Sequence, residues 1–331
     1  MPSICQILTN RSNIGYNLTM VSKYSYKKIT WVDLISPTVE EVEACAETYG
    51  IPDAVKEEIL RPTPRGRVDL YDDVVYLVLH FPDISNFSCK SNNSECEVLD
   101  EEFNFVVTKD AVLTIHPRKS EVLNNMAEKF DSPIIDGMPM FKGSSHDFFF
   151  SLLVQLYRGA THQVSDFDDV LQSIKEDIFD KKEAKMVGRI STVNHYLLDV
   201  KQITRFHGDI LNSLDTIGKD FFGHTFPLKS SSVFGEYNKM TALLESHREI
   251  LADLRITNDS LLQTSNNDAI RILTIITVIM LPLTLVTGFF GMNTFDGVEI
   301  IQGYDSIAFI ALSMFVIAFS MYIYFKSKKW L

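Results

Sequence analysis

Two uncharged apolar runs near the C-terminus constrain this chain more than any other feature of its sequence. The first run spans 272–290 and the second spans 306–325, with a short polar connection between them. As a helix, the first run measures about 28 Å, close to the roughly 30 Å thickness of a bilayer's hydrocarbon core. Two such runs in close succession predict a pair of transmembrane helices that form a membrane hairpin.

The first run carries a polar stripe along one side of its helix. At about 100° per residue, six residues fall within a sector of about 80°. They are Ile270, Thr274, Thr277, Leu281, Thr284 and Gly288, with Asn267 at the edge of the sector. Such a stripe suits the wall of a water-filled pathway. Alternatively, the threonines hydrogen-bond to their own helix or join it to a neighbouring helix. The spacing is compatible with both interpretations.

Charged residues at the ends of the two runs predict the orientation of the hairpin. Arg271 precedes the first run, and three lysines follow the second. The connection, 294–305, holds three acidic residues and no lysine or arginine. Because positive residues stay on the cytoplasmic side, we expect both termini in the cytoplasm and the acidic loop outside. The N-terminus lacks a charged region followed by an apolar one, so we expect no signal peptide and a cytosolic location for residues 1 to about 265.

Charge and motif content exclude several classes of function. The net charge is -12 and lies almost wholly ahead of the two runs. This argues against a nucleic-acid partner, because neutralising phosphate requires clustered lysine and arginine. The four cysteines show no CxxC pairing and are expected to be reduced. We find no phosphate-binding loop, nucleophile elbow or HExxH motif, so we expect no enzyme.

The N-terminal part predicts a mixed α/β domain. Apolar and β-branched runs predict strands at 29–35, 74–81, 103–108 and 111–116, the last two as a hairpin across Lys109 and Asp110. Between the first two strands, Thr38 and Glu41 form a potential capping box and open a helix. Gly50 stands where that helix requires a left-handed cap.

Beyond Gly143 the pattern changes to long helices. Apolar residues that step by three and four predict an antiparallel helical hairpin with its turn near 181–188. A further stripe begins at Val233 and continues into the first apolar run, with no proline before Pro282. It predicts one helix from about 231 to 290, some 90 Å long, which must pack against its own domain or against copies of itself. His247 lies on this stripe and is expected to be a packing residue rather than a metal ligand.

Three segments carry a family resemblance. The string TIITVIMLPLTLVTGFFGMN, 274–293, resembles the first transmembrane helix and the Gly-Met-Asn signature of the CorA family of magnesium channels. The final YFKSKKWL resembles the lysine-rich C-terminus of that family. The string WVDLISPTVEEVEACAETYGIP, which begins at Trp31, resembles the opening of its cytosolic domain. The resemblance covers nearly the whole chain.

The resemblance implies a homopentameric, funnel-shaped channel in the cell (inner) membrane, with an α/β cytosolic domain, a long stalk helix and two transmembrane helices. The implied parts are an α/β domain over 1–143, a helical hairpin over 144–230, a stalk and pore helix over 231–293, an outer loop over 294–305, and a second span with a basic tail over 306–331.

The resemblance also implies how the ion is recognised. Gly291, Met292 and Asn293 would form the selectivity filter, with a ring of Asn293 carbonyl oxygens accepting hydrogen bonds from the waters of hydrated Mg²⁺. This suits an ion that is reluctant to dehydrate, whereas carboxylates would slow its release. Mg²⁺ would be both the transported and a regulatory ion, with no organic cofactor. Other positions have subsidiary roles: a second carbonyl ring at Asn267, room for the ion at Thr284 and Gly288, constrictions at Leu281, Leu273 and Ile270, and cation attraction at Asp296 and Glu299.

Regulation is where the sequence departs from the family. CorA channels close when cytosolic Mg²⁺ bridges acidic residues of neighbouring subunits. Glu57 and Glu58 match the acidic pair on one side of such a bridge. Ser232, however, stands where the family has an aspartate in the stalk helix, and Gln155 occupies a second such position.

Two alternatives remain beside a Mg²⁺ channel that also admits Co²⁺ or Ni²⁺. A zinc or other divalent transporter of the same superfamily would share the architecture, although no cysteine or histidine lies on the pore stripe to favour zinc. A non-conducting, membrane-anchored scaffold would have no use for a polar stripe within its first span.

Overall fold

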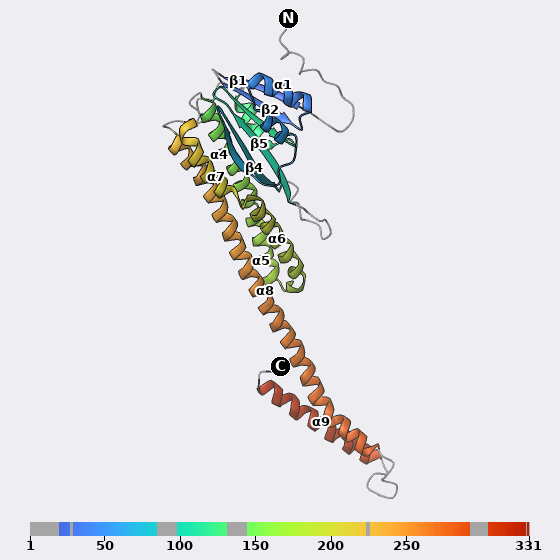
Figure 1. Ribbon diagram of the computed structural model, residues 1–331. Coiled ribbons are helices and arrows are strands. Elements are labelled where there is room, and N and C mark those ends of the chain that lie inside the picture. Colours follow the sequence, from blue (N-terminus) through green and yellow to red (C-terminus); the bar gives the residue numbers. More distant parts are fainter. Residues whose placement is uncertain are drawn as a thin grey trace. The chain divides into compact units, whose positions relative to one another are not determined.

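The computed structural model describes residues 20–26, 29–84, 98–130, 144–222, 226–291, 304–328 and 330. The chain divides into two compact units. The first unit comprises Met1–Glu176 and Gly188–Asp253, and the second comprises Asp177–Val187 and Leu254–Leu331. The ribbon in Figure 1 is coloured along the sequence, so the strands and the first helices of the first unit appear in blue and green.

A six-stranded sheet organises the first unit. Its spatial order is β1-β2-β6-β5-β4-β3. Strands β2 and β6 run parallel, and every other neighbouring pair runs antiparallel. The strands are β1 (Met20–Tyr26), β2 (Ile29–Ile35), β3 (Arg67–Tyr71), β4 (Val74–Asp83), β5 (Leu99–Val107) and β6 (Ala111–His116).

The central strands agree with the sequence prediction. Strands β2 and β6 have the predicted bounds. Strand β4 ends two residues later than predicted, and β5 begins four residues earlier and ends one residue earlier than predicted. The predicted hairpin across Lys109 and Asp110 joins β5 to β6 and is confirmed. The edge strands β1 and β3 are not predicted by the sequence, because MVSKYSY and RVDLY lack a continuous apolar run.

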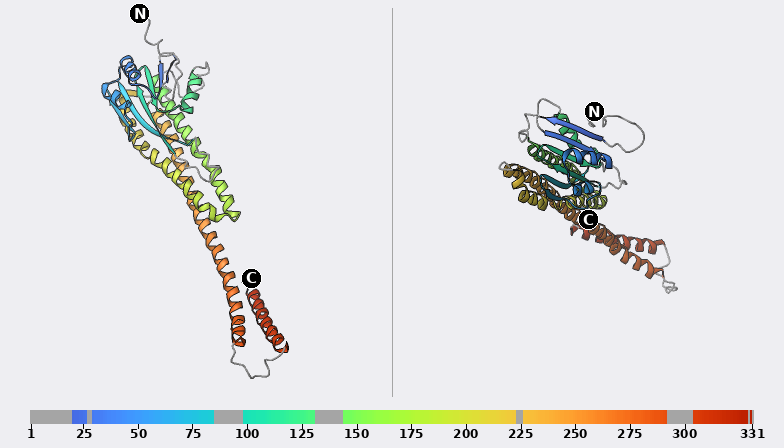
Figure 2. Two further views of the ribbon diagram at one scale, coloured as in Figure 1. Left: turned by 90° about the vertical axis from the view of Figure 1, so that its right-hand side faces the viewer. Right: turned by 45° about the horizontal axis from the view of Figure 1, so that its top comes forward.

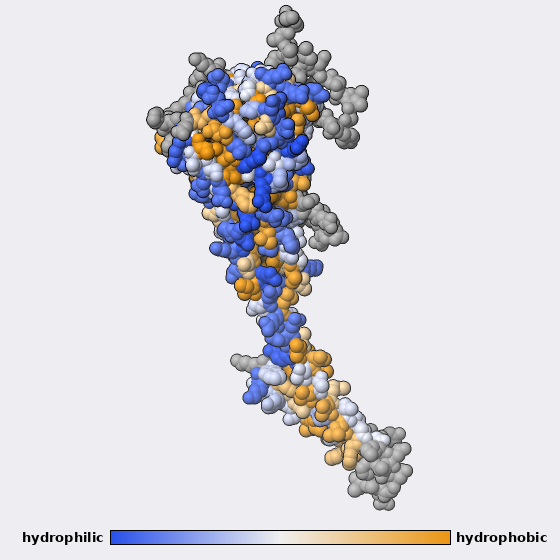
Figure 3. Space-filling view, viewed as in Figure 1, coloured by the Kyte–Doolittle hydropathy of each residue, from blue (hydrophilic) through white to orange (hydrophobic). Residues whose placement is uncertain are grey.

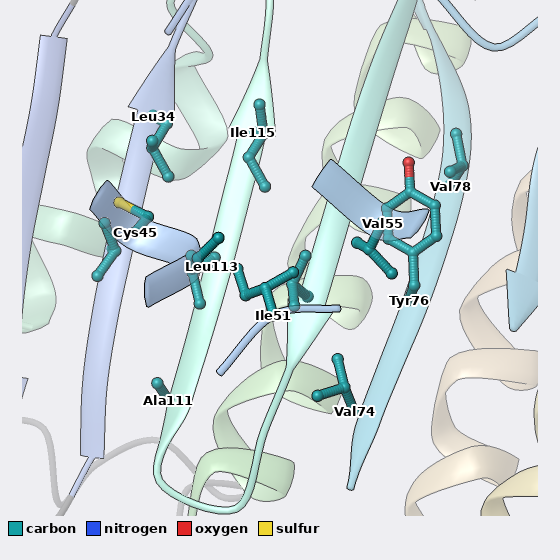
Figure 4. Packing of buried hydrophobic residues seen from close by; sticks show 13 residues of the cluster. Leu34, Cys45, Ile51, Val55, Val74, Tyr76, Val78, Ala111, Leu113 and Ile115 are labelled. Atoms are coloured by element: carbon teal, nitrogen blue, oxygen red, sulfur yellow. The ribbon is translucent and has the colours of Figure 1, made fainter. Parts of the chain in front are cut away.

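Two short helices cover one face of the sheet. They are α1 (Val39–Tyr49) and α2 (Asp53–Ile59). The predicted capping box of Thr38 and Glu41 is present, and Gly50 adopts the left-handed conformation with φ 66°. Cys45 of α1, Ile51 of the connecting segment and Val55 of α2 point onto sheet residues that include Leu113 and Tyr76 (Figure 4). Strands with both faces covered read as nearly continuous apolar runs, which explains why the central strands are predictable.

Other helices cover the opposite face. They are α3 (Glu121–Phe130), α4 (Ser145–Ser165) and α7 (His207–Phe222). Phe148 of α4 packs against Trp31, with the ring centroids 5.1 Å apart. Two buried polar contacts join the strands: the Trp31 Nε1–H donates to Thr114 Oγ1 at 3.0 Å, and His116 Nε2 lies 3.1 Å from Asp33 Oδ1. The predicted mixed α/β domain is therefore confirmed.

The remaining helices are α5 (Phe167–Phe179), α6 (Glu183–Thr204), α8 (Phe226–Phe290) and α9 (Tyr304–Ser327). The turn between α5 and α6 lies at 180–182, so the prediction of a turn near 181–188 is a few residues too late. The structure also differs from the prediction in having a break between α6 and α7. The helix is interrupted at Arg205 and Phe206, although the apolar stripe continues across these two residues. Helix α8 is continuous over 65 residues, as predicted, and begins about five residues earlier than expected.

A buried histidine makes the stability of the fold dependent on pH. His207 is 1 % exposed, and its Nδ1 lies 2.9 Å from the Tyr157 hydroxyl. Burial lowers the pKa of His207 to about 4. Between the pKa of about 6.5 expected for an unfolded chain and this lower value, only the unfolded chain binds the proton. The free energy of unfolding therefore falls as the pH drops through this window.

We expect this one group to lower the free energy of unfolding by about 2 kcal/mol between pH 7 and pH 5. In His207→Gln, the fall in the unfolding temperature between these two pH values should be smaller than in the wild type, as measured by thermal unfolding of the detergent-solubilised chain. His195→Gln, at an exposed histidine, is the control. Equal pH dependence in wild type and His207→Gln would contradict the prediction.

Candidate ion pathway

Among the described residues, two helices are long and apolar enough to cross a membrane. These segments are Leu228–Phe290 of α8, whose apolar end lies in the second unit, and Ala308–Ser327 of α9. Their mean hydropathies reach 2.3 and 2.1. The surface of the apolar end of α8 and of α9 is largely apolar (Figure 3). Such a surface suits contact with lipid or with other apolar helices.

Burial within one chain falls on a single face of the first span. Ile275 is 4 % exposed, and four further residues are half-buried. At about 100° per residue, all five lie between about 120° and 220° from Ile270. The half-buried residues are Ile279, Pro282, Leu283 and Val286.

Helix α9 has a matching covered face. Its partly covered residues recur at steps of three and four and end at Phe325, which is 8 % exposed. Figure 1 and the left view of Figure 2 show α9 beside the last part of α8. Two stripes with this spacing are typical of helices that pack lengthwise against each other. The two apolar helices thus form a hairpin that covers one side of the first span.

The predicted polar stripe lies on the opposite side of α8. Thr274, Thr277 and Thr284 are exposed, and so are the four other positions of the stripe. The large apolar residues among them are 62 % exposed at Ile270 and 67 % exposed at Leu281, and the neighbouring Leu273 is 65 % exposed. The hairpin thus leaves this face open to lipid, to water or to another copy of the chain.

The threonine hydroxyls hydrogen-bond to their own helix. Thr274, Thr277 and Thr284 donate to the carbonyls four residues earlier, at 2.8 to 2.9 Å. These are the bonds expected from the alternative interpretation of the stripe. They do not exclude a pathway, because a hydroxyl whose proton is engaged keeps lone pairs that accept hydrogen bonds. Each threonine therefore presents an acceptor, and the water molecules around a cation present donors.

Two glycines mark the far end of the span. A side chain at Gly288 would meet nothing within 4 Å, so one chain alone gives no steric reason for a glycine there. At Gly291, which follows the last helical residue, a Cβ would lie 3.0 Å from the Thr287 carbonyl oxygen. The Gly291 N–H donates to that same oxygen at 2.9 Å.

Met292, Asn293, Asp296 and Glu299 lie outside the described residues, and their roles stay predictions. The role of the exposed Asn267 also stays a prediction.

The acidic pair proposed for regulation lies on α2 in the first unit. Glu57 is exposed, and no ion pair to it is found among the described residues. Glu58 forms an ion pair with Arg67, which also contacts Asp69 at 3.1 Å. The Arg67 guanidinium lies 5.7 Å from the centre of the Tyr76 ring. Of the two acidic residues, Glu58 is therefore already paired with a cation of its own chain.

The stalk positions are also occupied by internal contacts. Ser232 is exposed, and its hydroxyl donates to the Leu228 carbonyl at 3.1 Å. Gln155 is half-buried on α4. Glu236, one turn beyond Ser232, accepts from Arg158 Nε at 2.8 Å. In the described part of one chain, no group of three or more His, Cys, Asp or Glu residues is placed to hold a metal ion.

His247 of α8 packs within the first unit, as predicted. It is 1 % exposed, and its Nε2 lies 2.8 Å from Asp168 Oδ1. Phe167 lies beside it, with the ring centroids 6.5 Å apart. These contacts are those of a packing histidine with a carboxylate partner.

An α/β unit, a long helix and two apolar C-terminal helices define a two-span membrane protein. The chain belongs to the CorA family, described as "CorA-like Mg2+ transporter protein", whose sequence profile matches residues 26–328. Among curated relatives, the "Cobalt/magnesium transport protein CorA" of Thermotoga maritima is 24% identical over 317 residues, which cover 91% of this chain and 83% of the relative.

Solved structures show the same fold. The complete CorA magnesium transporter from Methanocaldococcus jannaschii aligns with a TM-score of 0.75 at 17% identity, covering 96% of this chain and all of that chain. The cytoplasmic domain of ZntB from Vibrio parahaemolyticus aligns with a TM-score of 0.52 at 14% identity, covering 73% of this chain and 90% of that chain. At these identities the likeness concerns the fold alone.

Single cysteines can test whether the stripe faces water. In a background with the four native cysteines replaced by serine, we expect Thr284→Cys to react with a small charged thiol reagent in liposomes. Ile279→Cys, on the face that the hairpin covers, should react at least about tenfold more slowly, because it has little contact with water. Labelling rates are followed by mass spectrometry. Equal rates, or faster labelling of Ile279→Cys, would place the stripe in lipid or in a packing contact.

Proposed function

We propose that copies of this chain assemble into a channel that carries hydrated divalent cations across the membrane, with Mg²⁺ as the principal ion. One observation carries the proposal: the threonine stripe lies within the part of the α8 surface that the hairpin leaves open, opposite the covered residues. Membership of the CorA family supports the class of ion. Co²⁺ and Ni²⁺ are further candidate ions, and the Thermotoga relative is named for cobalt as well as magnesium.

Assembly follows from geometry. Two spans per chain cannot enclose a pore, so several copies must contribute their first spans. Resemblance to the family indicates a homopentamer, with α8 around the axis and α9 in an outer ring. Lipid would then contact the outer ring. The cytosolic α/β part, the helical hairpin and the stalk would remain on the side of both termini.

The polar groups proposed for the pathway suit a hydrated ion. Mg²⁺ dehydrates reluctantly, so a pathway lined by acceptors for its water shell avoids the cost of removing that shell. The threonine oxygens are such acceptors, and Asn293 would provide a ring of carbonyl oxygens at the outer end. Asn267 would provide another ring at the cytoplasmic end. Neutral oxygens bind weakly enough to release the ion, which conduction requires.

Apolar side chains on the same face would close the pathway. Ile270, Leu273 and Leu281 are exposed in one chain and alternate with the polar positions. When copies approach, rings of these side chains would narrow the pore and exclude water, which stops conduction without any charged gate.

Zinc is the second candidate ion, because a zinc transporter of the same superfamily would share this architecture. Zinc prefers nitrogen and sulfur ligands, and no histidine or cysteine occurs in α8 beyond His247. The two candidates are distinguished by measuring uptake of Mg²⁺, Co²⁺, Ni²⁺ and Zn²⁺ into liposomes that hold the purified protein.

The first functional prediction concerns the proposed selectivity filter. Asn293→Ala removes the proposed carbonyl ring, so Mg²⁺ uptake into liposomes should fall at least about tenfold, because a ring of hydrogen bonds to the hydrated ion is lost. The oligomer should persist, as judged by size-exclusion chromatography with light scattering. Asn238→Ala, at an exposed position of α8 in the first unit, should transport as the wild type does. Normal uptake by Asn293→Ala would remove this residue from the filter.

A regulatory site would require carboxylates from two copies, because the described part of one chain presents no group of acidic residues placed to hold a metal ion. Glu58 is paired with Arg67, Glu236 is paired with Arg158, and Ser232 is neutral. We therefore expect closure to need more internal Mg²⁺ than a bridge of unpaired carboxylates would.

Ser232→Asp should shift the inhibition of flux to lower internal Mg²⁺, because it adds a carboxylate facing the proposed bridge. Ser231→Asp adds the same charge about 100° away on the helix and should shift it less. Glu236→Gln should leave the curve unchanged, because that carboxylate is already engaged. Identical curves for Ser232→Asp and the wild type would show that this interface is not the sensor.

A further inference from the structure

A cavity of about 1010 Å³ lies in the first unit, and none of the residues proposed for the pathway line it. Its walls come from the loop before β3, from β4 and β5, from the C-terminal end of α6 and from the start of α7. This volume is at the upper end of the range typical of sites for small molecules. The proposed channel function makes no use of it.

Two of the three lysine and arginine residues in the cavity wall have no carboxylate partner in the described part of the chain. Arg65 and Arg205 both lie over the ring of Phe206, with the guanidinium carbons 5.6 and 5.3 Å from its centre. Both arginines are exposed. The third cation of the wall, Lys201, forms an ion pair with Glu245 at 2.7 Å. Both arginines therefore bring positive charge to this part of the cavity wall, where an anion would be attracted.

The position of the first arginine is fixed by its neighbour. A Cβ on Gly66 would lie 2.7 Å from both the Val78 carbonyl oxygen and Ile210 Cδ1. The loop is therefore pressed directly onto β4 and α7, and only glycine allows this approach. Arg65 is consequently presented from a fixed backbone, which reduces the entropic cost of binding.

The start of α7 adds a second element favourable to an anion. This helix of 16 residues begins at His207, a residue of the cavity wall. First-turn N–H groups of a helix have no partner within the helix and carry partial positive charge. Phosphate groups bind at such positions.

The rest of the wall suits the non-phosphate part of a ligand. Asp199 is exposed, and no ion pair to it is found in the described part of the chain. Asp100 Oδ1 lies 2.9 Å from His80 Nδ1. Carboxylates of this kind accept hydrogen bonds from hydroxyl groups. Leu198 is 38 % exposed and provides apolar surface for a flat ring.

We propose that this cavity binds a phosphorylated small molecule of nucleotide size, with Arg65 and Arg205 holding the phosphate. Such a ligand brings a negative charge that pairs with the arginines and hydroxyl groups that donate hydrogen bonds to the carboxylates. It also brings a ring that the apolar wall covers. The assignment rests on the cavity alone and does not depend on the proposed channel function.

Isothermal titration of the full chain in detergent tests this, in a buffer with chelator and no divalent ion. The probes are AMP, adenosine, glycerol 3-phosphate and inorganic phosphate. We expect AMP to bind most tightly, and adenosine to bind at least about tenfold more weakly, because it lacks the charge-assisted hydrogen bonds. Glycerol 3-phosphate tests whether a lipid headgroup would serve as well.

Matched variants assign the binding to the cavity. Arg65→Gln and Arg205→Gln should each weaken AMP binding about tenfold, and Arg205→Lys should weaken it less. Lys119→Gln, which removes an exposed charge outside the cavity wall, should leave it unchanged. Unchanged unfolding temperatures would show that the variants are folded.

Three results would overturn the proposal: no binding of any phosphate-bearing probe, wild-type affinity for AMP in both glutamine variants, or adenosine binding as tightly as AMP. Equal affinity for AMP and for either smaller phosphate would overturn the nucleotide-sized assignment. Because no ion flux is measured, failure here leaves the channel proposal intact, and loss of flux in a filter variant leaves this proposal intact.

Discussion

A bilayer interior offers no hydrogen-bond partner, so a chain can cross it only if the backbone satisfies its own N–H and C=O groups. Helix α8 meets this requirement as one uninterrupted helix through the span. Pro282 is the exception, because it has no N–H for the carbonyl four residues earlier. The threonine side chains follow the same constraint: their hydroxyl protons go to backbone carbonyls, and only acceptor capacity remains to face outward. The chemistry of the open face thus follows from the need to satisfy the helix.

The two faces of the first span differ in what one chain can cover. The hairpin covers Ile275 and the half-buried residues on the same face of the helix, whereas Leu281 and the threonines stay exposed. Hydroxyl groups facing lipid would gain nothing from exposure, and a row of them is better placed against water or another helix. A single copy provides neither on that side. The proposed assembly removes this mismatch by bringing equivalent faces together around water.

Local patterns predict the parts of this fold that local interactions determine. The capping box at Thr38, the left-handed Gly50 and the doubly covered strands follow from a few adjacent residues. The edge strands do not, because pairing with a neighbour rather than apolar content forms them. The break at Arg205 also escapes prediction, since the apolar spacing continues across it. The ion pair between Arg158 and Glu236 joins residues 78 apart in sequence, and no local pattern indicates it. The filter and the outer loop lie beyond the described residues and rest on resemblance.

The internal ion pairs connect these observations to the choice of ion ligands. Glu58 engages Arg67, Glu236 engages Arg158, and Asp168 engages His247. A divalent ion that used Glu58 or Glu236 would have to replace a cation already in contact and lose part of its own hydration. The acidic soluble part therefore stabilises itself with these carboxylates instead of presenting them as a ready metal site. On the proposed pathway, by contrast, the side-chain oxygens of the first span are neutral hydroxyls. Neutral oxygens exchange hydrogen bonds with the water shell of an ion and need no cation to balance them, which is the property that a conducting surface requires.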